Sequence, residues 1–201
     1  MYRVTRILKI IYDKDLEDFK AQVGPKYFEK IMKNAADRGT LFHAASEYLE
    51  NNFQTIGDDD PFFRGIKLNN ELIYPQIITY YKWLKENIEE VIFTEREFYD
   101  KSLDLGGRPD IIARLKGQKK IAVFDKKFTA KLSLKNHLQL AAYAELYRKE
   151  FGEMPDRYIL HFTKEGKFKI VKLKNQAMEF SMFMFAYNLN KYYNGNGCKK
   201  K

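Results

Sequence analysis

The stretch "GGRPDIIARLKGQKKIAVFDKKF", residues 106–128, decides the fold, because two apolar runs within it each carry one aspartate. Their β-branched and aromatic residues predict one strand over 109–115 and a second over 120–128, with a lysine-rich turn between them. Asp110 lies near the start of the first run, and Asp125 lies near the end of the second. The stretch therefore predicts a β-hairpin with two acidic side chains at one end.

The turn of this hairpin sets which residues face one another. We take Gly117 and Gln118 as its two central residues, because glycine in the first position suits a type II′ turn. Pairing then follows a fixed sum, and Asp110 falls opposite Asp125. Cross-strand neighbours on one face have Cβ atoms about 4.5–5.5 Å apart, and like charges there are destabilising. A one-residue change of turn would alter this register.

The second strand is apolar on both faces, as in a central strand that is covered on both sides. Its side chains alternate, so Ile121, Val123, Asp125 and Lys127 share one face. Two carboxylates at such a strand end are costly unless positive charge compensates them. Lys127 would supply one charge, and a divalent cation that prefers hard oxygen ligands would supply the rest. A simple Asp–Lys ion pair at a strand end explains the pattern equally well.

The remaining chain alternates between helical and extended patterns. We expect helices over 15–33, 35–51, 70–90, 134–152 and 176–193, a loop over 57–65, strands over 91–99, 157–163 and 168–173, and a frayed tail over 194–201. The order is helices, three strands, a helix, two strands and a helix. This order predicts an α/β or α+β sandwich around a mixed sheet.

Composition limits the class of protein. At 201 residues, with 45% hydrophobic residues, the chain predicts one globular domain. We expect no membrane span, no secretory signal and an intracellular location. The net charge of +9 favours a polyanionic partner, nucleic acid first, although lysines that only maintain solubility remain the alternative. Cys198 is the one cysteine, so we expect neither a disulfide framework nor a cysteine-based metal cluster.

Four motifs in order resemble the RecB-like branch of the PD-(D/E)XK nuclease superfamily, including its phage and mitochondrial exonucleases. These are "RGTLFHAASEYL" with His43, Asp110 in "GGRPDII", Asp125-Lys126-Lys127 in "IAVFDKKFT", and Gln139 with Tyr143 in "HLQLAAYAELY". The resemblance covers about residues 2–173. It implies a restriction-endonuclease-like α/β core, a mixed β-sheet flanked by helices.

The resemblance also implies one nuclease domain over 1–201. Its core would be about 35–175, with an N-terminal helical extension over 1–34 and a C-terminal helix and tail over 176–201. Many relatives have Glu at the position of Asp125. The four cysteines of the iron–sulfur members are absent, so we expect no iron–sulfur cluster.

Roles for individual residues follow from the same resemblance. Mg²⁺ or Mn²⁺ would be held by His43, Asp110, Asp125 and the backbone carbonyl of Lys126. The catalytic set would be Asp110, Asp125, Lys127, Gln139 and Tyr143. Lys127 would orient or help deprotonate the attacking water, or stabilise developing negative charge. Without the surrounding motif, His43 would read as a buried core histidine, and Gln139 and Tyr143 as ordinary parts of an amphipathic helix.

Other residues near the motifs are weaker candidates. Glu47, Glu95 and Glu97 could touch the site, but strand alternation alone cannot choose between Glu95 and Glu97. The expected DNA contacts are Arg38, Lys131, Lys135, Gln139 and Tyr143. Aromatic residues could stack on single-stranded bases, but core or rim packing is the better expectation for Phe62, Phe63 and Tyr80.

The expected function is metal-dependent hydrolysis of DNA. We favour an exonuclease of phage or prokaryotic recombination and repair, in the cytoplasm, acting on single- or double-stranded DNA ends. A structure-specific or site-specific endonuclease of the same fold is the alternative, and a non-catalytic nucleic-acid-binding module is the rival from another class. A single-strand-binding, annealing or helicase protein would be a separate partner chain.

Overall fold

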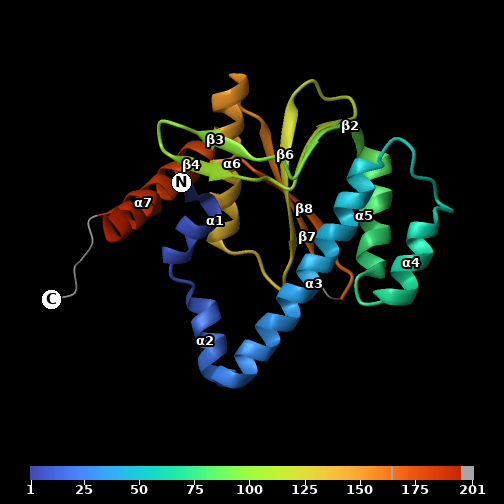
Figure 1. Ribbon diagram of the computed structural model, residues 1–201, viewed down its shortest axis with the longest axis horizontal. Coiled ribbons are helices and arrows are strands. Elements are labelled where there is room, and N and C mark those ends of the chain that lie inside the picture. Colours follow the sequence, from blue (N-terminus) through green and yellow to red (C-terminus); the bar gives the residue numbers. More distant parts are fainter. Residues whose placement is uncertain (164, 196–201) are drawn as a thin grey trace.

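A five-stranded mixed sheet forms the centre of the molecule in the computed structural model, which describes residues 1–163 and 165–195 (Figure 1). Its order is β2-β5-β6-β7-β8. The strands are β2 (Ile88–Thr94), β5 (Ile111–Leu115), β6 (Ile121–Phe128), β7 (Asp156–Phe162) and β8 (Phe168–Leu173). Only β6 and β7 run parallel, while the other neighbours are antiparallel. The mixed sheet predicted from the sequence is confirmed.

The parallel pair is connected by the helix α6 (Leu134–Phe151), as a crossover between parallel strands requires. Ser133 and Asn136 form a capping box at its start. Gly152 ends it in the left-handed conformation, with φ of 79°. The predicted helix over 134–152 is therefore confirmed.

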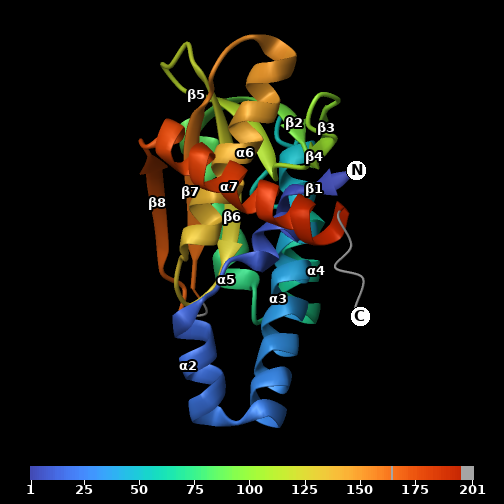
Figure 2. The same cartoon turned by 90° about the vertical axis from the view of Figure 1, so that its left-hand side faces the viewer.

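Helices cover both faces of the sheet (Figures 1 and 2). On one face, α6 and α7 (Gln176–Gly195) pack on a core that includes Val123. On the other, α3 (Pro25–Asn51) and α5 (Tyr74–Asn87) pack on a core that includes Phe124. Because neighbouring residues of β6 point to opposite cores, the strand is buried on both faces, as its sequence predicts.

The hairpin register is confirmed, but the turn is different from the predicted one. Ile111 pairs with Phe124, and the pairs continue with the same sum to Arg114 and Ile121, so Asp110 lies across from Asp125. The turn is closed by Gln118 N–H, which donates to Leu115 O at 3.0 Å. Lys116 and Gly117 are thus its central residues, and the expected Gly117–Gln118 turn is wrong. The register survives because the loop is longer than predicted by two residues on each side of Gly117 and Gln118.

The helical boundaries near the N-terminus also differ. One helix, α2 (Lys14–Val23), ends at Gly24, whose φ of 79° is easily adopted only by glycine. The next, α3, begins at Pro25 and continues unbroken to Asn51, so the expected break near residue 34 is absent. Together α2 and the first half of α3 form a helical hairpin that extends from the body (Figure 2).

The segment 57–65 is not entirely a loop. A further helix, α4 (Pro61–Asn69), begins within it, because Asp60 caps the N–H of Phe62 and Pro61 occupies the first turn. Similarly, the expected helix over 70–90 ends at Asn87, where β2 begins.

The single strand predicted over 91–99 is wrong, because β2 ends at Thr94 and residues 98–99 belong to a small second sheet that was not predicted. It has the order β1-β4-β3 and consists of β1 (Tyr2–Arg3), β4 (Leu105–Gly107) and β3 (Phe98–Asp100). After β1 the chain continues through α1 (Val4–Ile7) and η1 (Leu8–Ile10). No strand of this sheet exceeds three residues, which is too short for a periodic pattern. Its effect is to place the first residues of the chain beside β4.

At the other end of the chain, α7 confirms the predicted last helix over 176–193 and extends it to Gly195. Cys198 and the rest of the predicted tail beyond 195 lie outside the described residues. In the described part of the chain, no helix combines the length and apolar character needed to cross a bilayer.

Gly107 in β4 provides a test of packing beside the larger sheet. A Cβ at Gly107 would lie 2.7 Å from Tyr143 Cε1 and 2.8 Å from Leu146 Cδ1. We expect Gly107→Ala to lower the free energy of unfolding by about 1–3 kcal/mol. Gly65→Ala in α4, where a Cβ meets no atom within 4 Å, should instead raise it by up to about 1 kcal/mol. Denaturant unfolding followed by circular dichroism measures both; equal effects would contradict the close contact.

Candidate active site

Asp110 lies where β5 begins beside β6, and hydrogen bonds hold it on both its side chain and its backbone. Its Oδ2 accepts from the backbone N–H of Lys126 at 2.5 Å. Its backbone carbonyl accepts from the N–H of Glu95 at 3.0 Å. The carboxylate is buried but retains some exposure. Its position is therefore set by two strands of the sheet rather than by a flexible loop.

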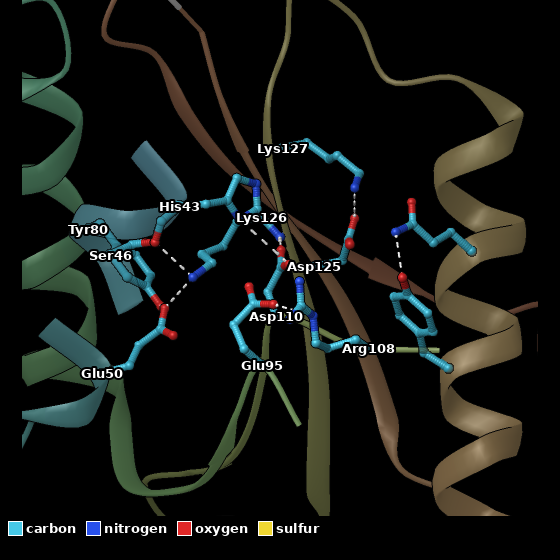
Figure 3. Close-up of polar contacts among 12 residues, drawn as sticks. His43, Ser46, Glu50, Tyr80, Glu95, Arg108, Asp110, Asp125, Lys126 and Lys127 are labelled. Carbon is cyan, nitrogen blue, oxygen red and sulfur yellow. Dashed lines mark hydrogen bonds and ion pairs between the residues drawn. The ribbon is translucent and has the colours of Figure 1, made fainter. Parts of the chain in front are cut away.

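His43 approaches Asp110 from α3 (Figure 3). Its Nδ1 lies 3.6 Å from Asp110 Oδ1. Burial lowers the pKa of the imidazole, although the Asp110 carboxylate and a hydrogen bond with the backbone of Lys126 partly oppose this. A neutral imidazole with a free ring nitrogen is the form that binds metals.

Glu95 joins these two residues from the segment that follows β2. Its φ of 49° is rare for a residue with a side chain, and it turns the chain at this point. Its Oε2 pairs with Arg108 Nε at 3.0 Å, and burial followed by the Asp110 charge raises its pKa. One ligand atom each of His43, Glu95 and Asp110 lie within 4.8 Å of one another. These residues could hold a metal ion.

Asp125 is fully buried, and it faces Lys127 rather than this group. Its Oδ2 lies 2.6 Å from Lys127 Nζ, while its Oδ1 has no hydrogen-bond partner among the described residues (Figure 3). Burial raises the pKa of Asp125 to about 7, and Lys127 partly offsets this. Burial alone would lower the pKa of Lys127, but Asp125 and Asp110 outweigh it and raise the pKa. Lys127 is therefore a cation.

Gln139 and Tyr143 close the site from α6. Gln139 Nε2 donates to the Tyr143 hydroxyl at 2.9 Å. Both line a pocket of about 580 Å³ with residues of α1, α3 and β4. The remaining lining residues are Arg3, Val4, Thr5, Thr40, His43, Glu95, Glu97, Gly106, Gly107, Arg108, Asp110 and Lys127. The fold thus brings five of the predicted site residues to one pocket.

The three expected basic DNA contacts do not line this pocket. Arg38 and Lys135 are partly exposed on α3 and α6. Lys131 is largely exposed, and its Nζ lies 3.5 Å from Asp15 Oδ2 on α2. Of the aromatic candidates, Tyr80 is fully buried and Phe63 nearly so, while Phe62 is partly buried against the same core, so the expected core or rim packing is confirmed.

Comparison with known proteins identifies the family of the chain. The family model described as "PD-(D/E)XK nuclease superfamily" matches residues 18–185. The chain belongs to the PD-(D/E)XK nuclease superfamily. Members of this superfamily use divalent metal ions. The donor set fits such an ion, because it combines a neutral imidazole with carboxylates, and Asp125 Oδ1 is a buried acceptor without a donor.

Solved structures with a similar arrangement are distant. A protein from Eubacterium rectale named "Putative exonuclease" is 16% identical, with a TM-score of 0.44, over 74% of this chain and 64% of that one. The chain thus spans less than two thirds of that protein. A protein named SSO0001 is also 16% identical, with a TM-score of 0.34, over 75% of this chain and 86% of that one. No curated protein matches.

The Asp125–Lys127 pair predicts a pH-dependent effect on stability. Lys127→Met leaves the buried Asp125 without its cation. Because a carboxyl with a pKa of about 7 can take up a proton at pH 8 at a cost of about 1.4 kcal/mol, we expect the free energy of unfolding to fall by about 1–2 kcal/mol at pH 8. The pKa of Asp125 is higher in the folded than in the unfolded state, so the folded state binds the extra proton as pH falls. The loss relative to wild type should therefore shrink between pH 8 and pH 6. Chemical denaturation at both pH values measures it, and an equal loss at the two would contradict the assignment.

Proposed function

We propose that this superfamily member is a divalent-metal-dependent DNA nuclease that hydrolyses phosphodiester bonds, and that it acts as an exonuclease in recombination or repair. The observation that carries the proposal is the convergence of His43, Glu95 and Asp110 in a pocket that Lys127 also lines, where Lys127 is paired with the buried Asp125. The net charge of +9 suits a polyanionic substrate.

The metal ligands proposed are His43, Asp110 and Glu95, with Asp125 and the carbonyl of Lys126 completing the set. A bound Mg²⁺ or Mn²⁺ supplies charge neutralisation at the scissile phosphate and lowers the pKa of a water molecule. The burial of Asp110 and the hydrogen bond from the Lys126 N–H fix the orientation of its carboxylate. His43 would bind the metal ion as a neutral imidazole, because burial lowers its pKa.

Lys127 is the residue proposed to act on the reacting groups. Lys127 lines the pocket, and its ammonium forms an ion pair with the Asp125 carboxylate. A fixed cation there would orient the attacking water and stabilise negative charge that develops on the phosphate.

The substrate is proposed to enter along the rim of the pocket. Gln139 and Tyr143 would position it on one side, and Arg3 and Arg108 on the rim offer charges for phosphate oxygens. Arg38, Lys131 and Lys135 would contact phosphates farther from the scissile bond. Binding should then weaken as salt concentration rises.

Removal of the metal or of one carboxylate tests catalysis separately from binding. We expect EDTA, Asp110→Ala and Asp125→Ala each to reduce DNA cleavage by about 10²-fold or more, because each removes charge stabilisation at the phosphate. DNA binding, measured by fluorescence anisotropy, should persist in the variants. Glu90→Ala, an exposed carboxylate of β2 paired with Arg114, is the matched control and should cleave normally. Cleavage that survives in all three cases would show that the site is wrongly assigned.

The form of the DNA substrate distinguishes an exonuclease from an endonuclease. We expect linear DNA to be degraded with Mg²⁺ or Mn²⁺ while covalently closed circles of the same sequence stay intact, because an exonuclease requires an end. Gel analysis over time, with 5′- and 3′-labelled single and double strands, measures both the requirement and the polarity. Nicking of the circles at a comparable rate would replace the exonuclease proposal with an endonuclease.

A further inference from the structure

A second buried polar cluster lies on the face of β6 opposite Asp125. The Lys126 side chain is fully buried there, and its Nζ lies 2.5 Å from Glu50 Oε1 and 2.8 Å from Ser46 Oγ (Figure 3). The Tyr80 hydroxyl of α5 donates to the same Glu50 oxygen at 2.6 Å. These four residues do not line the pocket.

Stability alone is a poor reason for this cluster. Taking two charges out of water is costly, and replacing a buried ion pair by apolar residues of similar size is often neutral or stabilising. Other positions on the same face of β6 are apolar, namely Ala122 and Phe124. The ion pair therefore needs another explanation.

Its position along α3 points to the site. Ser46 and Glu50 are three and seven residues after His43, so all three lie on one face of the helix. The buried residues of α3 all fall between Phe42 and Glu50, so the helix is held to the body by its last turns only. Anchors in this short region decide how α3 is rotated over β6.

Lys126 joins the two sides of the candidate metal site. Its backbone N–H donates to Asp110 Oδ2 at 2.5 Å and so holds the carboxylate. Its side-chain ammonium donates hydrogen bonds to Ser46 and Glu50 of α3. One residue thus connects the helix that carries the imidazole to the strand that fixes the carboxylate.

We propose that Lys126 and Glu50 are positioning residues. Their buried ion pair holds α3 against β6 and keeps the His43 imidazole close enough to Asp110 for both to bind one metal ion. The inference rests on the proposed metal-dependent function. It adds two side chains that touch neither metal nor substrate. They act through His43, because that is the ligand carried by the helix they hold.

The test removes both charges together, so that no unpaired charge stays buried. The variant Lys126→Met/Glu50→Leu is compared with Lys172→Met/Asp156→Asn, which removes an ion pair between β7 and β8 outside the pocket. All measurements are made below the melting temperatures of the two double variants. Mn²⁺ affinity is measured by electron paramagnetic resonance, and kcat and KM are measured with linear DNA. We expect the buried variant to bind Mn²⁺ about tenfold more weakly and to lose kcat, with KM for DNA unchanged. The control should match wild type.

A double-mutant cycle with His43→Ala separates positioning from general loosening. If the ion pair acts through His43, the Lys126→Met/Glu50→Leu change should cost no further Mn²⁺ affinity once the imidazole is gone. Unchanged affinity in the buried variant, or a loss that adds to that of His43→Ala, overturns the inference. Should the double variant unfold, Tyr80→Phe carries the same test, with a smaller weakening expected and unchanged affinity overturning it. Wild-type protein that neither binds Mn²⁺ nor cleaves DNA would instead refute the proposed function beneath it.

Discussion

The hydrogen bond from the backbone N–H of Lys126 to Asp110 Oδ2 is the interaction on which the site depends. It extends the pairing of β5 and β6 by one step, using a side chain where the ladder itself has ended. A carboxylate bonded to a backbone N–H inside a sheet cannot move without the strand. The Asp110 carboxylate is therefore held as firmly as the sheet itself, and the other site residues are arranged around it.

Strand alternation explains how so many charges are buried within three residues of β6. Asp125 and Lys127 face the α6 side and pair with each other, while Lys126 points to the α3 side and pairs with Glu50. Each face thus carries a matched pair, so neither apolar layer holds an isolated charge. The same alternation places one face of the strand in the pocket and leaves the other to hold a helix.

The sequence was sufficient where a local pattern determines the contact. The register that sets Asp110 across from Asp125 was predicted from a turn centred on Gly117 and Gln118. It holds although the turn itself lies one residue earlier, because the loop between Arg114 and Ile121 is still centred on those two residues. Glu95 could not be chosen over Glu97, since its direction comes from a φ of 49° that no alternation encodes. The side chain of Lys126 was also missed, because its partners Ser46 and Glu50 lie 80 and 76 residues away. Long-range pairs of this kind become visible only when helix and strand are packed.

Charge bookkeeping around the pocket supports the place proposed for the metal ion. Glu50 pairs with Lys126, Asp125 with Lys127, and Glu95 with Arg108. Among the described residues, Asp110 forms no ion pair with a lysine or arginine side chain, and the basic side chain paired with it is His43, whose pKa is lowered by burial. The uncompensated negative charge of the cluster is thus concentrated on the one carboxylate that the sheet holds in place. A divalent cation is attracted to that charge, and it would meet ligands that need little rearrangement to receive it.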